Sequence, residues 1–164
     1  MKPALLKPGQ RGPQRSYQPA ACDKRSIAFH EAGHCVVVQH FGMDWTALIV
    51  RAAEATDAGE AWEGIICHES LPPFRDSVCG WAGPLAEKFA RGGAFDALDG
   101  LIQFELDPLW ASPSDRTAIR SHHQYYRAAK SAEAILWRYS ATLHRIASVL
   151  MERSTLRRAE FTAA

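Results

Sequence analysis

The sequence of 164 residues lacks several patterns that would assign it to a common class of protein. Its four cysteines include no C-x-x-C pair, which argues against a cysteine-rich zinc finger and provides no disulfide framework. No apolar run approaches 18 residues and no apolar leader is visible, so neither a membrane span nor a signal peptide is predicted. Basic and acidic residues are balanced at 19 and 18, which gives no bias toward nucleic acid or membrane partners. We therefore expect a cytoplasmic protein.

The amino-terminal segment differs in composition from the rest of the chain. Residues 1–20 contain four prolines and four basic residues but no acidic residue. Such a segment buries too little apolar surface to offset the entropy of ordering it, so a disordered basic tail is predicted. Residues 21–164 have the length of one domain, and the overall hydrophobic content of 47% is sufficient for a core.

The most informative motif is H-E-x-x-H, which is formed by His30, Glu31 and His34. On a helix, residues four apart lie on one face, so the two imidazoles can converge on one metal ion. Two imidazoles and a carboxylate suit Zn²⁺, which lowers the pKa of a bound water to about 7 at an open position. Glu31 could then accept a proton from that water as general base. The motif thus predicts a zinc hydrolase, most simply a peptidase.

The residues around the motif argue against a chance match. A pattern with three fixed positions also arises by accident, often on a polar surface helix. Here the motif lies between the apolar stretches 27–29 and 35–38, which indicates a largely buried helix. Two histidines and a glutamate inside such a helix are costly unless something satisfies them, and a metal ion would do so.

Periodicity and turn signals predict a mainly α fold with one small β-hairpin beside the active-site helix. The first helix would begin at Asp23 or Ser26 and end before Gly42. Residues 46–51 and 62–68 have the composition of two strands, joined by a turn into the hairpin.

The second half of the chain is predicted to be helical. A helix is expected at 76–90, and the acidic, aromatic stretch 94–112 is expected to form a loop with a short helix. One long helix is predicted to begin at Pro113, and helical spacing of apolar residues continues from Ala132 to Leu150.

A catalytic zinc site needs a third protein ligand from elsewhere in the chain. Asp115 would be held by the start of a helix, whereas Glu87 would lie inside a helix that faces another. Spacing and composition do not choose among the candidates, which are Glu87, Asp115, His68, His122 and His123.

A resemblance to a known family does choose among them. The stretches 28–34, 48–51 with 64–72, 80–87, 112–118 and 146–160 follow the order of motifs in the peptidase domain of FtsH-type ATP-dependent zinc proteases. The resemblance implies that His30, His34 and Asp115 bind Zn²⁺ and that Glu31 is the catalytic base. It also implies that Glu87 lies next to the site without binding the metal and orients an imidazole, although a surface pairing with Lys88 or Arg91 is equally compatible with the sequence.

The chain also departs from that family. No G-x-x-x-x-G-K-[ST] motif is present, so no ATPase module is expected, and the acidic segment 94–112 could line or cover the cleft. The predicted substrate is an unfolded or flexible peptide, and the resemblance suggests a homo-oligomer or a separate ATPase as partner. Two alternatives remain open, a metal-binding adaptor without turnover and a different kind of small HExxH protein such as a repressor-cleaving metallopeptidase.

Overall fold

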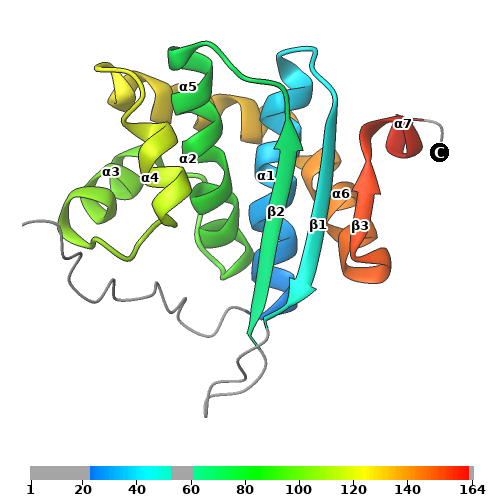
Figure 1. Cartoon of the computed structure of the whole chain (residues 1–164). Coiled ribbons are helices and arrows are strands. Elements are labelled where there is room, and N and C mark those ends of the chain that lie inside the picture. Colours follow the sequence, from blue (N-terminus) through cyan, green and yellow to red (C-terminus); the bar gives the residue numbers. More distant parts are fainter. Residues whose placement is uncertain (1–22, 53–60, 163–164) are drawn as a thin grey trace, which may run out of the picture.

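The computed structural model of this chain describes residues 23–52 and 61–162, and only these are discussed below. They form seven helices and three strands, so the predicted mainly α architecture is confirmed (Figure 1). The predicted tail at 1–20 and the turn of the hairpin lie outside the described residues. The elements in chain order are α1 Lys24–His40, β1 Trp45–Arg51, β2 Trp62–His68, α2 Pro73–Ala90, α3 Ala97–Leu106, α4 Pro113–Ile119, α5 Tyr125–Arg138, α6 Ser140–Arg153, β3 Thr155–Arg157 and α7 Arg158–Thr162.

Helix α1 is the central element, buried along most of its length. Its start is fixed by Asp23, whose carboxylate accepts a hydrogen bond from the Ser26 amide at 2.7 Å. It ends at Phe41, and Gly42 follows with a φ of 80°, which glycine adopts without strain. The sheet, α2 and α6 pack around it, so a polar side chain on α1 is enclosed by neighbours (Figure 1).

The two predicted strands pair as an antiparallel hairpin, from Trp45 opposite His68 to Arg51 opposite Trp62. The prediction of a hairpin alone was incomplete, because β3 pairs antiparallel with the other side of β1. The order β2-β1-β3 leaves β2 at the edge of the sheet. This edge lines the cleft at the candidate site.

Helix α2 crosses α1 at very short range. It begins at Pro73 rather than at residue 76, because proline at the first position of a helix loses no hydrogen bond. A Cβ atom added to Gly33 of α1 would lie 2.5 Å from the backbone oxygen of Ala82, so glycine is required at this crossing. The close approach brings α2 against the histidine face of α1.

The single long helix predicted from Pro113 is wrong, since the chain forms three helices there. Helix α4 ends at Ile119, where the Ser121 hydroxyl turns back to donate to the Pro73 carbonyl at 2.8 Å. A second break occurs at Tyr139, between α5 and α6. The apolar residues predicted from periodicity are divided between α5 and α6, and most of them are buried in the core.

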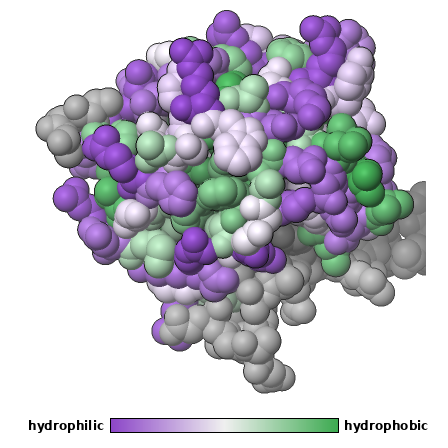
Figure 2. Space-filling view, turned by 180° about the vertical axis from the view of Figure 1, so that it is seen from behind, coloured by the Kyte–Doolittle hydropathy of each residue, from purple (hydrophilic) through white to green (hydrophobic). Residues whose placement is uncertain are grey.

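Helix α3 is the short helix expected within the segment 94–112, and its outer face is unusually apolar. Its outer face exposes Leu98, Ile102 and Leu106, at 63%, 48% and 76% of their maximum. In Figure 2, hydrophobic side chains gather at the edge where α3 lies after the rotation. None of the helices in the described ranges is long and apolar enough to cross a membrane.

Candidate metal centre

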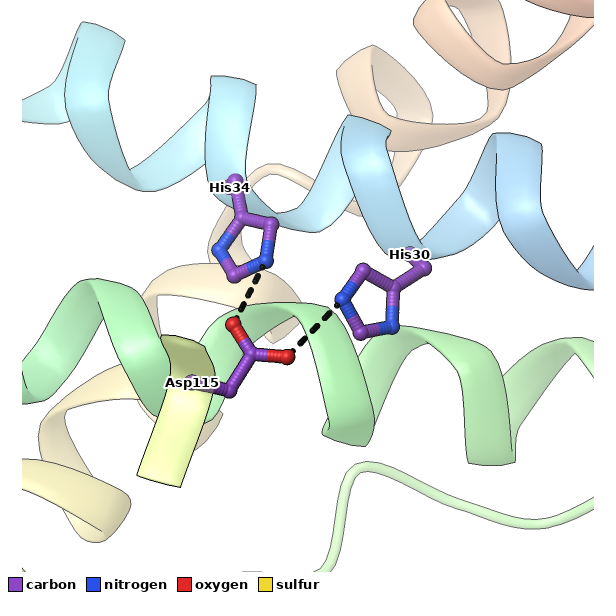
Figure 3. A group of neighbouring side chains, drawn as sticks. All are labelled: His30, His34 and Asp115. Atoms are coloured by element: carbon purple, nitrogen blue, oxygen red, sulfur yellow. Dashed lines mark ion pairs between the residues drawn. The ribbon is translucent and has the colours of Figure 1, made fainter. Parts of the chain in front are cut away.

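Three side chains from two distant parts of the chain converge beside α2. His30 and His34 lie one turn apart on α1, and Asp115 projects toward them from the first turn of α4 (Figure 3). Asp115 Oδ2 lies 3.2 Å from His30 Nε2, and Asp115 Oδ1 lies 3.3 Å from His34 Nε2. One ligand atom from each residue lies within 4.8 Å of the others, so the three form a group that could hold a metal ion.

The separations fit a small divalent cation. Ligand atoms at about 2.0–2.2 Å from a tetrahedral Zn²⁺ lie about 3.3–3.6 Å from one another. The two separations of 3.2 and 3.3 Å, each to a different oxygen of Asp115, are close to this range. The donor set of two imidazoles and one carboxylate is also one that zinc accepts in catalytic sites.

The hydrogen bond made by Nδ1 of each imidazole determines whether the Nε2 atom that faces Asp115 carries a proton. His30 Nδ1 donates to the Glu87 carboxylate at 3.0 Å, and His34 Nδ1 donates to the Cys79 carbonyl at 2.9 Å. A neutral imidazole therefore presents an unprotonated Nε2 to Asp115, whose oxygens are also acceptors. Two acceptors at this distance repel each other unless a metal cation or protons lie between them.

In the metal-free protein, the pKa values of the three side chains favour protonated imidazoles beside an ionised Asp115. Burial alone would lower the pKa of His30, but attraction to Asp115 outweighs it and raises the pKa to about 10. The pKa of His34 is raised for the same reason, and that of Asp115 is lowered by the two imidazoles in spite of its burial. Protons thus occupy the positions that a cation would take.

Glu87 contacts His30 and also pairs with Arg91, so it has both of the roles that the sequence left open. Its Oε2 accepts from His30, and its Oε1 accepts from Arg91 Nη2 at 2.6 Å. Lys88 pairs instead with Asp99 of α3. The Arg91 pairing orients the Glu87 carboxylate, which in turn fixes the tautomer and direction of His30.

Ser112 contacts the candidate ligand Asp115 and was not singled out from the sequence. Its hydroxyl donates to Asp115 Oδ2 at 2.7 Å and accepts from the Asp115 amide at 3.1 Å. The spacing of three residues between a serine and an acidic residue at the start of a helix is a capping signal that could have identified it.

Two glycines leave room at the centre. A Cβ atom added to Gly83 of α2 would lie within 2.5 Å of Nε2 of both His30 and His34. A Cβ atom added to Gly64 of β2 would overlap the carboxylate of Glu31. These gaps allow the histidine pair and the glutamate to share one enclosed space.

Glu31 lies in this space without the hydrogen bonds that a buried carboxylate needs. It is 4% exposed, and its Oε2 has no hydrogen-bond partner among the described residues. Burial raises the pKa of this carboxyl, which the nearby imidazoles oppose. An unsatisfied buried acceptor costs about 1–3 kcal/mol, so its retention here indicates a role other than stability.

The remaining histidine candidates are not part of the group. His122 and His123 pack on each other near Phe74 and do not line the cleft. His68 lines the cleft at the end of β2 and interacts with Cys79, a buried residue that also contacts His34 and that the sequence did not single out. Burial alone would raise the pKa of the Cys79 thiol, but hydrogen bonds with His34 and His68 lower it.

The centre opens into a cleft of about 480 Å³. Strand β2 forms one wall, while α2 and the start of α4 form the other. Apolar walls are supplied by Ile27, Trp62, Ile65 and Ile66. The space is large enough for a short peptide segment to reach the metal centre.

A scan against models of known protein families gives no match for this chain, and a search among curated proteins gives none. The resemblance to FtsH-type peptidases therefore depends on the motifs quoted above and on their order, and it stays a prediction. The convergence of His30, His34 and Asp115 is independent of that resemblance, because it is observed in the fold.

Proposed function

We propose that this protein is a zinc-dependent endopeptidase that hydrolyses unfolded or flexible peptides. The observation that carries the proposal is Glu31 Oε2, a buried oxygen without a partner in the same space as His30, His34 and Asp115. A structural zinc site is closed by four protein ligands, whereas a hydrolytic site needs three ligands and a spare base. The arrangement fits the second kind.

Each residue of the centre has a distinct task in this proposal. His30, His34 and Asp115 would hold the zinc ion, which when bound supplies Lewis acidity for the hydrolysis of an amide bond. Glu31 takes a proton from the attacking water and delivers it to the leaving amine. Glu87 and the Cys79 carbonyl keep the two imidazoles in the tautomer that directs Nε2 to the metal.

The edge strand supports a peptide as substrate. Strand β2 pairs with β1 on one side only, and its residues line the cleft on the other side. An extended peptide could therefore pair with the backbone of β2 and pass alongside Glu31. Only chains that can become extended would fit, which favours unfolded or flexible substrates.

The resemblance to FtsH-type peptidases agrees with the same assignment of residues. The family combines its peptidase with an ATPase, and these 164 residues contain no P-loop. A separate ATPase or a homo-oligomer as partner stays part of the proposal. We attach no role in the chemistry to either.

Hydrolysis of an unfolded protein such as casein tests the proposal. The zinc-loaded protein should cleave it, and a chelator should abolish cleavage. Glu31→Gln should keep its zinc and lose at least about 100-fold in rate, because an amide cannot accept a proton. Glu69→Gln is the matched control, since Glu69 is exposed and outside the cleft.

Two results would contradict the proposal in different ways. Undiminished cleavage by Glu31→Gln would show that Glu31 is not the base. A wild-type protein that binds zinc at full occupancy but cleaves no peptide would instead support the metal-binding adaptor.

A further inference from the structure

The cleft beside the metal centre is lined by negative charge. Among the described residues that line it, five are carboxylates and none is a lysine or arginine. The five are Glu31, Glu63, Asp76, Glu87 and Asp115. This local excess contrasts with the whole chain, whose basic and acidic residues are nearly equal in number.

Three of the five carboxylates are already explained by the metal centre. Asp115 faces the histidines, Glu87 is shared between His30 and Arg91, and Glu31 is the base in the proposed reaction. Glu63 and Asp76 have no such task, and within the described ranges neither side chain has an ion-pair partner. Their charges are therefore available to a ligand in the cleft.

The two carboxylates lie at opposite ends of the cleft. Glu63 is near the start of β2, on the exposed face of the strand, whereas its neighbour Gly64 lies against Glu31 on the other face. Asp76 is in the first turn of α2, seven residues before Gly83, and is therefore about 10 Å from it along the helix axis. Because β2 and α2 run in opposite directions, their first residues lie at opposite ends of the cleft (Figure 1).

A bound dication does not reverse the sign of this field. Five carboxylates exceed the two charges of a zinc ion and the single charge of Arg91, which pairs with Glu87, so negative charge still predominates along the cleft. Clefts lined by one sign of charge attract ligands of the opposite sign and raise their rate of association. Lys24 stacks on the Trp62 ring, 4.7 Å from its centroid, and does not line the cleft.

We propose that the cleft selects cationic peptides, with a lysine or arginine on each side of the bond to be cleaved. Glu63 would pair with a basic side chain that a peptide aligned with β2 presents on the exposed face of the sheet, and Asp76 would pair with one at the other end of the cleft. Ile65 and Ile66, which point to opposite faces of β2, would contact alternate residues between them. This inference rests on the proposed peptidase function and names its substrate class.

Matched peptides that differ only at the two flanking positions test the inference. We would compare lysine, glutamine and glutamate at these positions and measure kcat/KM with zinc-loaded protein. The lysine peptide should be preferred over the glutamine peptide by about ten-fold, with the glutamate peptide poorest. The preference should shrink as ionic strength rises from about 0.05 to 0.5 M, because salt screens exposed charges.

Variants locate the source of the preference. Glu63→Gln and Asp76→Asn should each reduce the ratio of kcat/KM for lysine over glutamine peptides about two- to five-fold, and together about ten-fold. Glu69→Gln should leave the ratio unchanged, because Glu69 does not line the cleft. An equal rate for all three peptides, or an unchanged ratio in the double variant, would overturn the inference.

A binding measurement separates this inference from the proposed reaction. Fluorescence anisotropy of the same peptides on zinc-loaded Glu31→Gln protein reports selection without turnover. Tighter binding of the lysine peptide supports the acidic cleft even if no peptide is hydrolysed. Equal binding of all three peptides refutes the inference, whatever happens to catalysis.

Discussion

At the scale of single residues, Ser112 shows how a short polar side chain determines a metal ligand. Its hydroxyl both donates to the Asp115 carboxylate and caps the helix that carries it. The carboxylate therefore has one oxygen fixed by Ser112 and both oxygens directed at the histidines. The position of Asp115 depends on this local contact as well as on the packing of α4 against α2.

Ser112→Ala should weaken zinc binding. Loss of a partner that orients a ligand typically costs 10–100-fold in metal affinity, and we expect a loss within about this range. Competition against a chromogenic chelator would measure it, with Asp115→Ala as the larger loss for comparison. Thr117→Val removes a hydroxyl from the same helix without touching Asp115 and should be neutral. Equal affinities for Ser112→Ala and wild type would show that the hydroxyl does not position the ligand.

Zinc binding should release protons and weaken in acid. In the metal-free protein the pKa of His30 is about 10, because attraction to Asp115 outweighs burial, so at pH 7 zinc must displace a proton. A raised pKa favours the protonated form that competes with zinc, so the apparent affinity should rise from about pH 6 to pH 9. Calorimetry in two buffers of different ionisation enthalpy should show at least about one proton released per zinc at pH 7. Identical heats in the two buffers would contradict this.

At the scale of elements, the crossing of α1 and α2 both supports the fold and shapes the site. Gly33 lets the two backbones approach at Ala82, and Gly83, the next residue of α2, leaves space for the histidines. The two glycines belong to the same helix pair but face different neighbours. Added methyl groups should therefore have separable effects.

Gly33→Ala should lower stability, and Gly83→Ala should impair the site. The first methyl group would press on backbone, with an expected loss of about 1–3 kcal/mol in the free energy of unfolding of the metal-free protein. The second would displace both imidazoles, and zinc affinity should fall by at least about 100-fold. Denaturant unfolding and a zinc titration of each variant measure the two effects. Normal zinc affinity in Gly83→Ala would show that the methyl group can be accommodated.

The elements also show what the sequence could and could not predict. Strand β2 occupies the predicted residues, because alternation and flanking turn residues are local signals. The break between α4 and α5 has no glycine or proline to mark it, and depends on the distant contact of Ser121 with Pro73. Strand β3 has only three residues, so its identity is determined by pairing with β1 rather than by its own pattern.

The candidate site was predictable to a similar degree. His30 and His34 follow from helical spacing alone, because both lie on one helix. Asp115 lies 81 positions after His34 and was chosen by family resemblance, since spacing on one helix says nothing about contacts with a distant element. Glu63 and Asp76 line the cleft only because of how β2 and α2 pack, and no local signal in the sequence marks them.

At the scale of the whole molecule, basic and acidic residues are nearly equal in number, but the cleft is lined by acidic residues. The exposed apolar face of α3 lies outside this cleft. Neither feature supplies a means of unfolding a substrate. We therefore expect zinc-loaded protein to cleave a reduced, unfolded protein and to spare the same protein in its native state. Parallel time courses on gels would measure this, and efficient cleavage of a stable native domain by these 164 residues alone would contradict it.

The proposed function requires that His30, His34 and Asp115 together bind one zinc ion. Elemental analysis after zinc loading and desalting tests it most directly, on wild type and on the His30→Ala/His34→Ala double variant. We expect about one zinc per chain in wild type and almost none in the double variant, because one three-ligand site is present in the described residues. A wild-type protein without zinc, or a double variant that keeps full occupancy, would contradict it.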